Sequence, residues 1–267
     1  MKTNLSEGGN VFKDADKKPL TQRIATADVQ STVDYIEQVT GLDFTEEKDD
    51  DNFPVKWLGT TGRKNDPDGT FELNSSGDLD LSVDANEVDK KDFATKMKTK
   101  FGNDSVKLSG DNVHVKVPIN GDEKNGFVQA DFMFSNDPKY QQGSMIGGSG
   151  QYRGEHRHIV LSSIARAKNL KYSPKSGLMD PDSNEVITTD WNTIAKELLG
   201  QTATVKDIKS VDAILNYIKK LPNYEELIAA ARETLGRYDI ELPKKEAFEN
   251  YQPGSIGWMR SIIDIVS

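Results

Sequence analysis

The fold is decided by WLGTTGRKNDPDGTFELNSSGDLDLSVD (residues 57–84) and FVQADFMF (residues 127–134). Each stretch contains a run in which apolar residues occupy every second position, which is typical of a β-strand because successive side chains point to opposite faces. The aliphatic face of the first run consists of Leu79, Leu81 and Val83. Asp78 and Asp80 lie on the other face of that run, and Asp131 lies opposite the apolar face of the second. We therefore predict two strands, each with a buried apolar face and an acidic face.

The acidic faces bring three carboxylates together if the two strands are neighbours in one sheet. Asp78 and Asp80 are separated by about 6.6 Å along their strand, at a rise of about 3.3 Å per residue. Three converging carboxylates repel one another unless a cation lies between them, and Mg²⁺ prefers carboxylate, water and phosphate oxygens. We therefore predict a metal–phosphate site in which Asp78, Asp80 and Asp131 are both metal ligands and catalytic residues. A solvated acidic face without a ligand is the alternative.

This pattern resembles the signature of the DNA polymerase β-like nucleotidyltransferase superfamily, over about residues 50–135. That signature is Gly-Ser/Thr, a loop, Asp-x-Asp on a strand and a third Asp on a later strand, here matched by Gly59-Thr60, SSGDLD and Asp131. The resemblance is to members of the kind found in phage genomes. It implies two Mg²⁺ ions, with Mn²⁺ as a substitute, and transfer of a nucleoside monophosphate from an NTP such as ATP to an acceptor hydroxyl. It also implies that Gly59, Thr60 and Ser76 bind the nucleotide.

A basic segment follows the third aspartate. Residues 151–175 carry six basic residues and one acidic residue, a net charge of +5 in a chain whose net charge is −9. The basic residues are Arg153, Arg157, Arg166, Lys168, Lys171 and Lys175. We predict that this segment meets phosphates, with Arg157 and Lys168 as nucleotide-binding residues. Its charge exceeds what one triphosphate needs, so we favour RNA as the acceptor over a protein or a small molecule. A solvated helix face would carry similar charges.

The sequence does not have the residue spacing of an EF-hand loop or of a dinucleotide-binding fingerprint. If Gly69 took the sixth position of an EF-hand loop, Lys64 would be first and Ser75 twelfth, where Asp and Glu are required. The glycines of residues 143–150 do not have the spacing of a dinucleotide fingerprint, and we predict a loop at the edge of the cleft. With no cysteine and three histidines, a zinc enzyme is disfavoured. One of those histidines, His114, lies on a polar strand face with no assigned partner.

The remaining patterns predict an α+β fold with a mainly helical C-terminal region, and the resemblance implies that the α+β part is a nucleotidyltransferase core around a mixed β-sheet. We expect an irregular arm over residues 1–25, the core over 26–140, and a helical region with a β-hairpin over 150–267, which forms the other wall of the cleft. The elements expected in the core are a helix at 27–41 ended by Gly41, strands at 53–59, 78–84 and 125–134, a helix at 92–101 and a hairpin at 105–118. Those expected after it are a helix at 155–168, a hairpin at 171–189 that turns at DPDSN, and helices with apolar stripes at 208–218 and 227–235.

Composition restricts the class of protein. The chain has 267 residues, 35% of them hydrophobic, with 34 Lys and Arg against 43 Asp and Glu. We find no apolar stretch long enough for a membrane span and no apolar signal-peptide core, and therefore expect a cytoplasmic protein without a membrane partner. The alternative function is a catalytically inactive nucleotidyltransferase-like module that acts through protein contacts.

Overall fold

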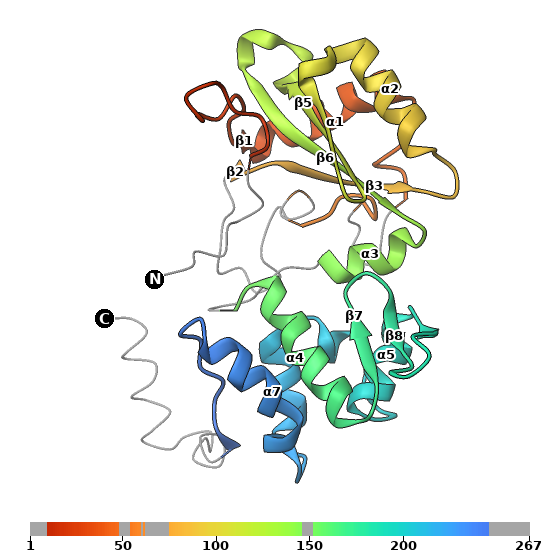
Figure 1. The fold of residues 1–267 in the computed structure, drawn as a ribbon, viewed down its shortest axis with the longest axis vertical. Coiled ribbons are helices and arrows are strands. Elements are labelled where there is room, and N and C mark those ends of the chain that lie inside the picture. Colours follow the sequence, from red (N-terminus) through yellow and green to blue (C-terminus); the bar gives the residue numbers. More distant parts are fainter. Residues whose placement is uncertain (1–9, 48–53, 60, 62–74, 146–151, 246–267) are drawn as a thin grey trace. The chain divides into compact units, whose positions relative to one another are not determined.

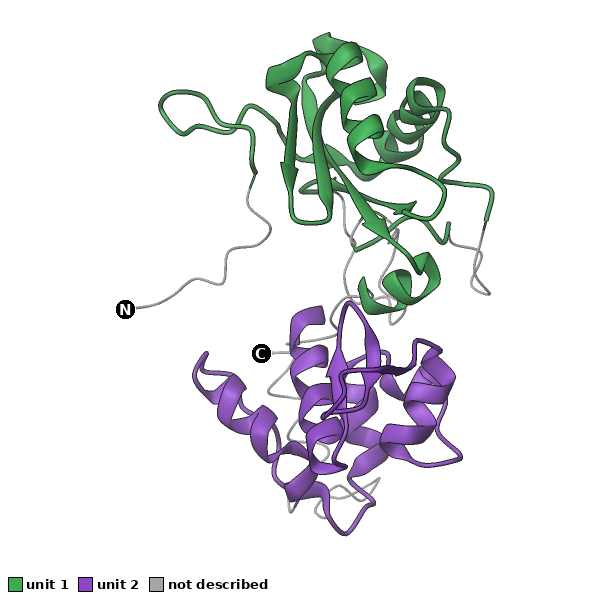
Figure 2. Ribbon diagram, turned by 45° about the vertical axis from the view of Figure 1, so that its right-hand side comes forward, with its two compact units in different colours: residues 1–146 green, residues 147–267 purple. Residues whose placement is uncertain are grey.

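The protein is a mixed α/β chain with two compact units, residues 1–146 and 147–267 (Figures 1 and 2). A computed structural model describes residues 10–47, 54–59, 61, 75–145 and 152–245. These residues contain seven α-helices and a mixed sheet, so the predicted α+β class is confirmed at this level. None of the helices they form has the length and apolar character needed to cross a membrane.

The first unit is built on a four-stranded sheet with the order β3-β6-β5-β4. Its strands are β3 (Leu79–Asp84), β4 (Val106–Ser109), β5 (Asn112–Pro118) and β6 (Phe127–Ser135). β3 runs parallel to β6, and the other neighbours are antiparallel. The predicted strands at 78–84 and 125–134 and the hairpin at 105–118 are confirmed. A separate antiparallel pair is formed by β1 (Ile24–Ala25) and β2 (Ser75–Ser76).

Two helices, α1 (Thr26–Thr40) and α2 (Lys90–Phe101), pack on the apolar face of this sheet (Figure 1). α1 ends at Gly41 as predicted, because Gly41 adopts a left-handed φ of 72°. Asp89 caps the N-terminus of α2, and its carboxylate accepts hydrogen bonds from two backbone N–H groups of the first turn. The face of β6 buried against them is the predicted one: Val128, Ala130, Phe132 and Phe134. The acidic face of the sheet is therefore turned away from this core.

Two local predictions for the first unit were wrong. Residues 54–59 form bridges at Pro54 and Trp57, the latter with Leu81, instead of a continuous strand, because the chain turns between them and the N–H of Trp57 donates to the Pro54 carbonyl (3.1 Å). Phe53 lies outside the described residues. The predicted loop at 143–150 begins inside α3 (Pro138–Met145), a helix capped by Asp137 through the N–H of Tyr140 (2.9 Å). The rest of that loop lies outside the described residues.

The second unit is mainly helical. Its helices are α4 (Gly154–Ala167), α5 (Trp191–Leu199), α6 (Val211–Ile218) and α7 (Tyr224–Gly236). The predicted apolar stripes are confirmed, because their residues on α6 and α7 are buried. Where a two-stranded hairpin was predicted, three antiparallel strands occur: β7 (Lys171–Ser173), β8 (Gly177–Met179) and β9 (Val186–Thr188). The DPDSN turn joins the last two, and its Asp180 accepts from two backbone N–H groups.

Candidate metal centre

Strand register brings the three predicted carboxylates together. In the parallel pair of β3 and β6, Asp80 lies directly opposite Asp131. Asp78 immediately precedes β3 and points to the same side, two residues before Asp80. Each of the three offers a carboxylate oxygen, and these oxygens all lie within 4.8 Å of one another. The spacing is short enough for one cation, or a pair of cations, to be shared by all three side chains.

Without a cation, burial and mutual repulsion disfavour the ionised form of the clustered carboxylates. Burial raises the pKa of the Asp80 carboxyl well above its usual range, and the neighbouring charges of Asp78 and Asp131 raise it further. Asp131 itself is only 8% exposed. Ionising all three groups therefore costs free energy that a bound cation would offset.

A backbone turn that contains Leu58 and Gly59 lies close to the carboxylates. Gly59 has a φ of 53°, and a Cβ placed on it would lie 2.7 Å from Oδ2 of Asp80. The turn is held to β3 by the N–H of Leu58, which donates to the Asp80 carbonyl (2.9 Å), and by Thr61 Oγ1, which accepts from the Asp80 N–H (2.7 Å). The predicted nucleotide-binding residue Gly59 is thus next to the cluster, and Thr60 lies outside the described residues.

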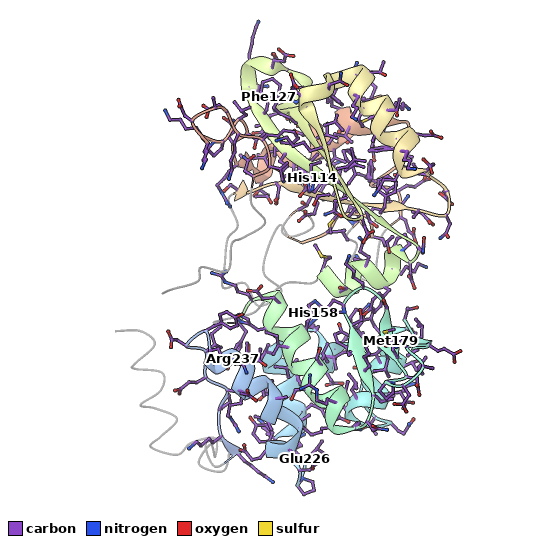
Figure 3. The ribbon with its side chains drawn as sticks, viewed as in Figure 1. His114, Phe127, His158, Met179, Glu226 and Arg237 are labelled. Atoms are coloured by element: carbon purple, nitrogen blue, oxygen red, sulfur yellow. The ribbon has the colours of Figure 1, made fainter. Side chains whose placement is uncertain are left out.

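Two residues that support the cluster were missed by sequence reasoning. His114 lies on β5 (Figure 3), opposite Asp131 in the strand register, and its Nδ1 is 2.7 Å from Asp131 Oδ1. Gln129 Nε2 donates to the other oxygen of Asp131 at 3.2 Å. The available signal was the alternation of both strands, which puts His114 and Gln129 on the acidic face. The pairing of β5 with β6 was not part of the prediction.

Arg23 is a further residue that no sequence pattern indicated. Its guanidinium donates to the Oγ and the carbonyl oxygen of Ser75, at 3.0 and 2.9 Å. It also lies 3.4 Å from the position that a Cβ on Gly77 would take. The predicted nucleotide-binding residue Ser76 is buried in β2, where it pairs with Ile24. A positive charge therefore stands beside the segment that leads into Asp78.

The two basic residues predicted to bind phosphate belong to the second unit. Arg157, on α4, is 2% exposed; its Cζ lies 5.1 Å from the ring centre of Trp191, and its guanidinium donates to the carbonyl of Lys209 (3.4 Å). Lys168 Nζ donates to the carbonyl of Glu197 at 3.0 Å. Both residues thus have contacts inside their own unit, and phosphate binding by either stays a prediction.

Comparison of this chain with models of protein families, with curated proteins and with solved structures found no match. The chemistry of the described residues is therefore the basis for a functional assignment.

Proposed function

We propose that this protein is a metal-dependent nucleotidyltransferase that moves a nucleoside monophosphate from an NTP to an acceptor hydroxyl. The observation that carries the proposal is the convergence of Asp78, Asp80 and Asp131 within 4.8 Å on neighbouring parallel strands. The resemblance of their sequence context to the DNA polymerase β-like superfamily supports the same activity.

The residues fit a hard divalent cation. All three donors are carboxylates, which Mg²⁺ and Mn²⁺ prefer, and a bound cation would offset the burial and the neighbouring charges that raise the pKa of Asp80. Asp78 and Asp80 would hold two ions, and Asp131 the one nearer the acceptor. When bound, such a pair lowers the pKa of an attacking hydroxyl and neutralises the departing pyrophosphate.

The backbone turn beside the cluster suits a triphosphate. Because Gly59 has no side chain, the backbone can approach the Asp80 carboxylate closely, and a phosphate bound at the carboxylates would lie beside this turn. Thr60 and Ser76 complete the proposed nucleotide-binding set of the first unit, and Arg23 adds a positive charge near Asp78. Arg157 and Lys168 belong to the same proposal from the second unit.

We further propose RNA as the acceptor, because the basic segment over residues 151–175 carries more positive charge than one triphosphate needs. Protein side chains and small molecules are the alternative acceptors.

The activity is tested by incubating the protein with each α-labelled NTP, Mg²⁺ and a cell extract. We expect label to enter an acceptor with at least one NTP, and the variant Asp78→Asn to lose more than about 100-fold of this activity, beyond the 10–100-fold typical for loss of a residue that only supports a metal ligand. Asp84→Asn is the matched control, since Asp84 lies at the far end of β3 and its carboxylate accepts from Asn86. Absence of labelled product from a protein that binds Mn²⁺ would favour the inactive binding module instead.

A further inference from the structure

Both oxygens of Asp131 are held by side chains of the same sheet. His114 donates through Nδ1 to Oδ1 at 2.7 Å, a tautomer assigned from the pairing because an ionised carboxylate only accepts. Gln129 donates through Nε2 to Oδ2 at 3.2 Å. The three residues are 7%, 3% and 8% exposed, in the order His114, Gln129 and Asp131. A buried carboxylate held by two buried donors has one preferred orientation.

The amide of Gln129 is itself fixed from outside the sheet. The backbone N–H of Val11 donates to Gln129 Oε1 at 2.9 Å. Because a backbone N–H can only donate, Oε1 must face Val11, and the NH₂ group must then face Asp131. The orientation of this amide therefore follows from its partners.

The segment that contains Val11 is anchored on the same face of the sheet. Lys107, on β4, donates through Nζ to the Val11 carbonyl, and its ammonium lies 5.4 Å from the ring centre of Phe12. Phe12 is 1% exposed, although the neighbouring arm residues are mostly polar. Burial of this aromatic ring holds Val11 at a defined position next to Gln129.

We propose that His114 and Gln129 are positioning residues for Asp131, and that the N-terminal arm belongs to the metal centre through the N–H of Val11. This inference rests on the proposed function, because it takes Asp131 to be a metal ligand. With one hydrogen bond on each oxygen, the carboxylate keeps its remaining lone pairs directed toward a cation shared with Asp78 and Asp80. Loss of such supporting hydrogen bonds typically costs 10–100-fold in metal affinity.

Matched variants of the full chain separate hydrogen bonding from packing. His114→Asn places an amide nitrogen near the former Nδ1, whereas His114→Leu has a similar size and no donor. Gln129→Met keeps the length of the side chain and removes the amide. Val11→Pro deletes the backbone N–H, and Val11→Ala keeps it.

The probe is Mn²⁺ alone, with its affinity measured by the electron paramagnetic resonance signal of the free ion. We expect the Leu, Met and Pro variants to bind Mn²⁺ about 10–100-fold more weakly than the native chain, and the Asn and Ala variants to stay within about threefold of it. The rise in melting temperature at a fixed Mn²⁺ concentration should shrink in the first three and persist in the other two.

Three results would overturn the inference. The first is native Mn²⁺ affinity in the Leu, Met and Pro variants with a lower metal-free melting temperature, which would assign the three groups a structural role only. The second is equal weakening by His114→Asn and His114→Leu. The third is equal Mn²⁺ affinity in the native chain and in Asp131→Asn, which would also remove the metal centre on which the proposed function depends. If His114→Leu does not fold, the Gln129 and Val11 variants decide the question by themselves.

Discussion

Asp80 is placed to bind a cation, but its buried carboxylate destabilises the folded protein when no cation is bound. Its folded pKa is raised by burial and by two neighbouring carboxylates. A carboxyl group of this kind stabilises the fold fully only below its unfolded pKa of about 3.9, and that stability is lost as pH rises through the folded pKa.

We therefore predict that Asp80→Asn makes the metal-free protein more stable near neutral pH. The amide removes the buried charge, so its melting temperature in the presence of a chelator should exceed that of the native chain by about 2–4 °C for each kcal/mol gained. The difference should shrink as pH falls toward the ordinary range of a carboxyl group. Saturating Mn²⁺ should reverse the order, because only the native chain keeps the full ligand set. A variant less stable than the native chain at every pH would contradict the prediction.

Gly59 offers a second test at the scale of one residue. An alanine there would place its Cβ 2.7 Å from Oδ2 of Asp80, and we expect Gly59→Ala to weaken Mn²⁺ binding at least tenfold, a loss of about 1.4 kcal/mol. Gly110→Ala is the control for backbone strain: Gly110 has the same φ of 53°, but a Cβ there would meet nothing within 4 Å. Both variants carry the strain of a left-handed alanine, about 1–2 kcal/mol. Equal Mn²⁺ affinity in the two would show that the contact with Asp80 is unimportant.

At the scale of the element, hydrophobic periodicity and helix-ending residues in the sequence predicted most helices and strands of the first unit. Strict alternation identified β3 and β6, and helical spacing with Gly41 identified α1 and its end. The stretch at residues 53–59 also alternates, yet its Pro54 and the turn that follows leave one bridge to β3. Alternation describes side-chain direction alone and does not reveal the turn at residues 54–57, which explains this error.

Local sequence patterns could not predict the hydrogen bonds that hold the metal centre. The three aspartates follow from their strands and from the resemblance to a known signature. The partner of His114 depends on the register between β5 and β6, which side-chain alternation leaves undefined. The contact of Val11 with Gln129 joins positions 118 residues apart. Its donor is a backbone N–H, which almost every residue type has, so the residue identity at position 11 does not indicate the contact.

The N-cap of α5 provides a test at this scale in the second unit. Asp190 accepts from the backbone N–H and the hydroxyl of Thr193, at 2.8 and 2.7 Å, and these hydrogen bonds lower the pKa of its carboxyl. We expect Asp190→Ala to cost about 1 kcal/mol of unfolding free energy and Asp190→Asn much less. Because the folded pKa is lowered, the difference between the native chain and the Ala variant should diminish as pH falls through that pKa. Urea unfolding followed by tryptophan fluorescence would measure it; a loss that does not change with pH would argue against the cap.

At the scale of the whole molecule, charge is unevenly divided along the chain. The segment over residues 151–175 has a net charge of +5 within a chain of −9. We predict that replacing Arg166, Lys171 and Lys175 together with Ala lowers RNA affinity and leaves NTP affinity unchanged, because the proposed nucleotide-binding residues Arg157 and Lys168 are kept. The log–log slope of RNA affinity against salt should become shallower by about 0.7 for each RNA phosphate that the variant no longer neutralises.

The control for this variant removes the same charge elsewhere in the second unit, by replacing Lys206, Lys219 and Lys220 with Ala. RNA affinity at low salt that is identical in the native chain and both variants would reject RNA as the acceptor. Loss of NTP affinity in the first variant alone would assign the basic segment to the triphosphate.

The contact between Val11 and Gln129 also has a consequence during protein synthesis. At about 5–20 residues per second, the ribosome adds Gln129 roughly 6–24 s after Val11, given the separation of 118 residues. Throughout that interval the arm exists without the strand that carries Asp131 and Gln129, and the Asp-x-Asp strand is also synthesised before that strand. A nascent chain therefore acquires its full set of carboxylates only when β6 emerges, and the arm docks after that event. We therefore expect the growing chain to bind a metal ion only after β6 has been synthesised.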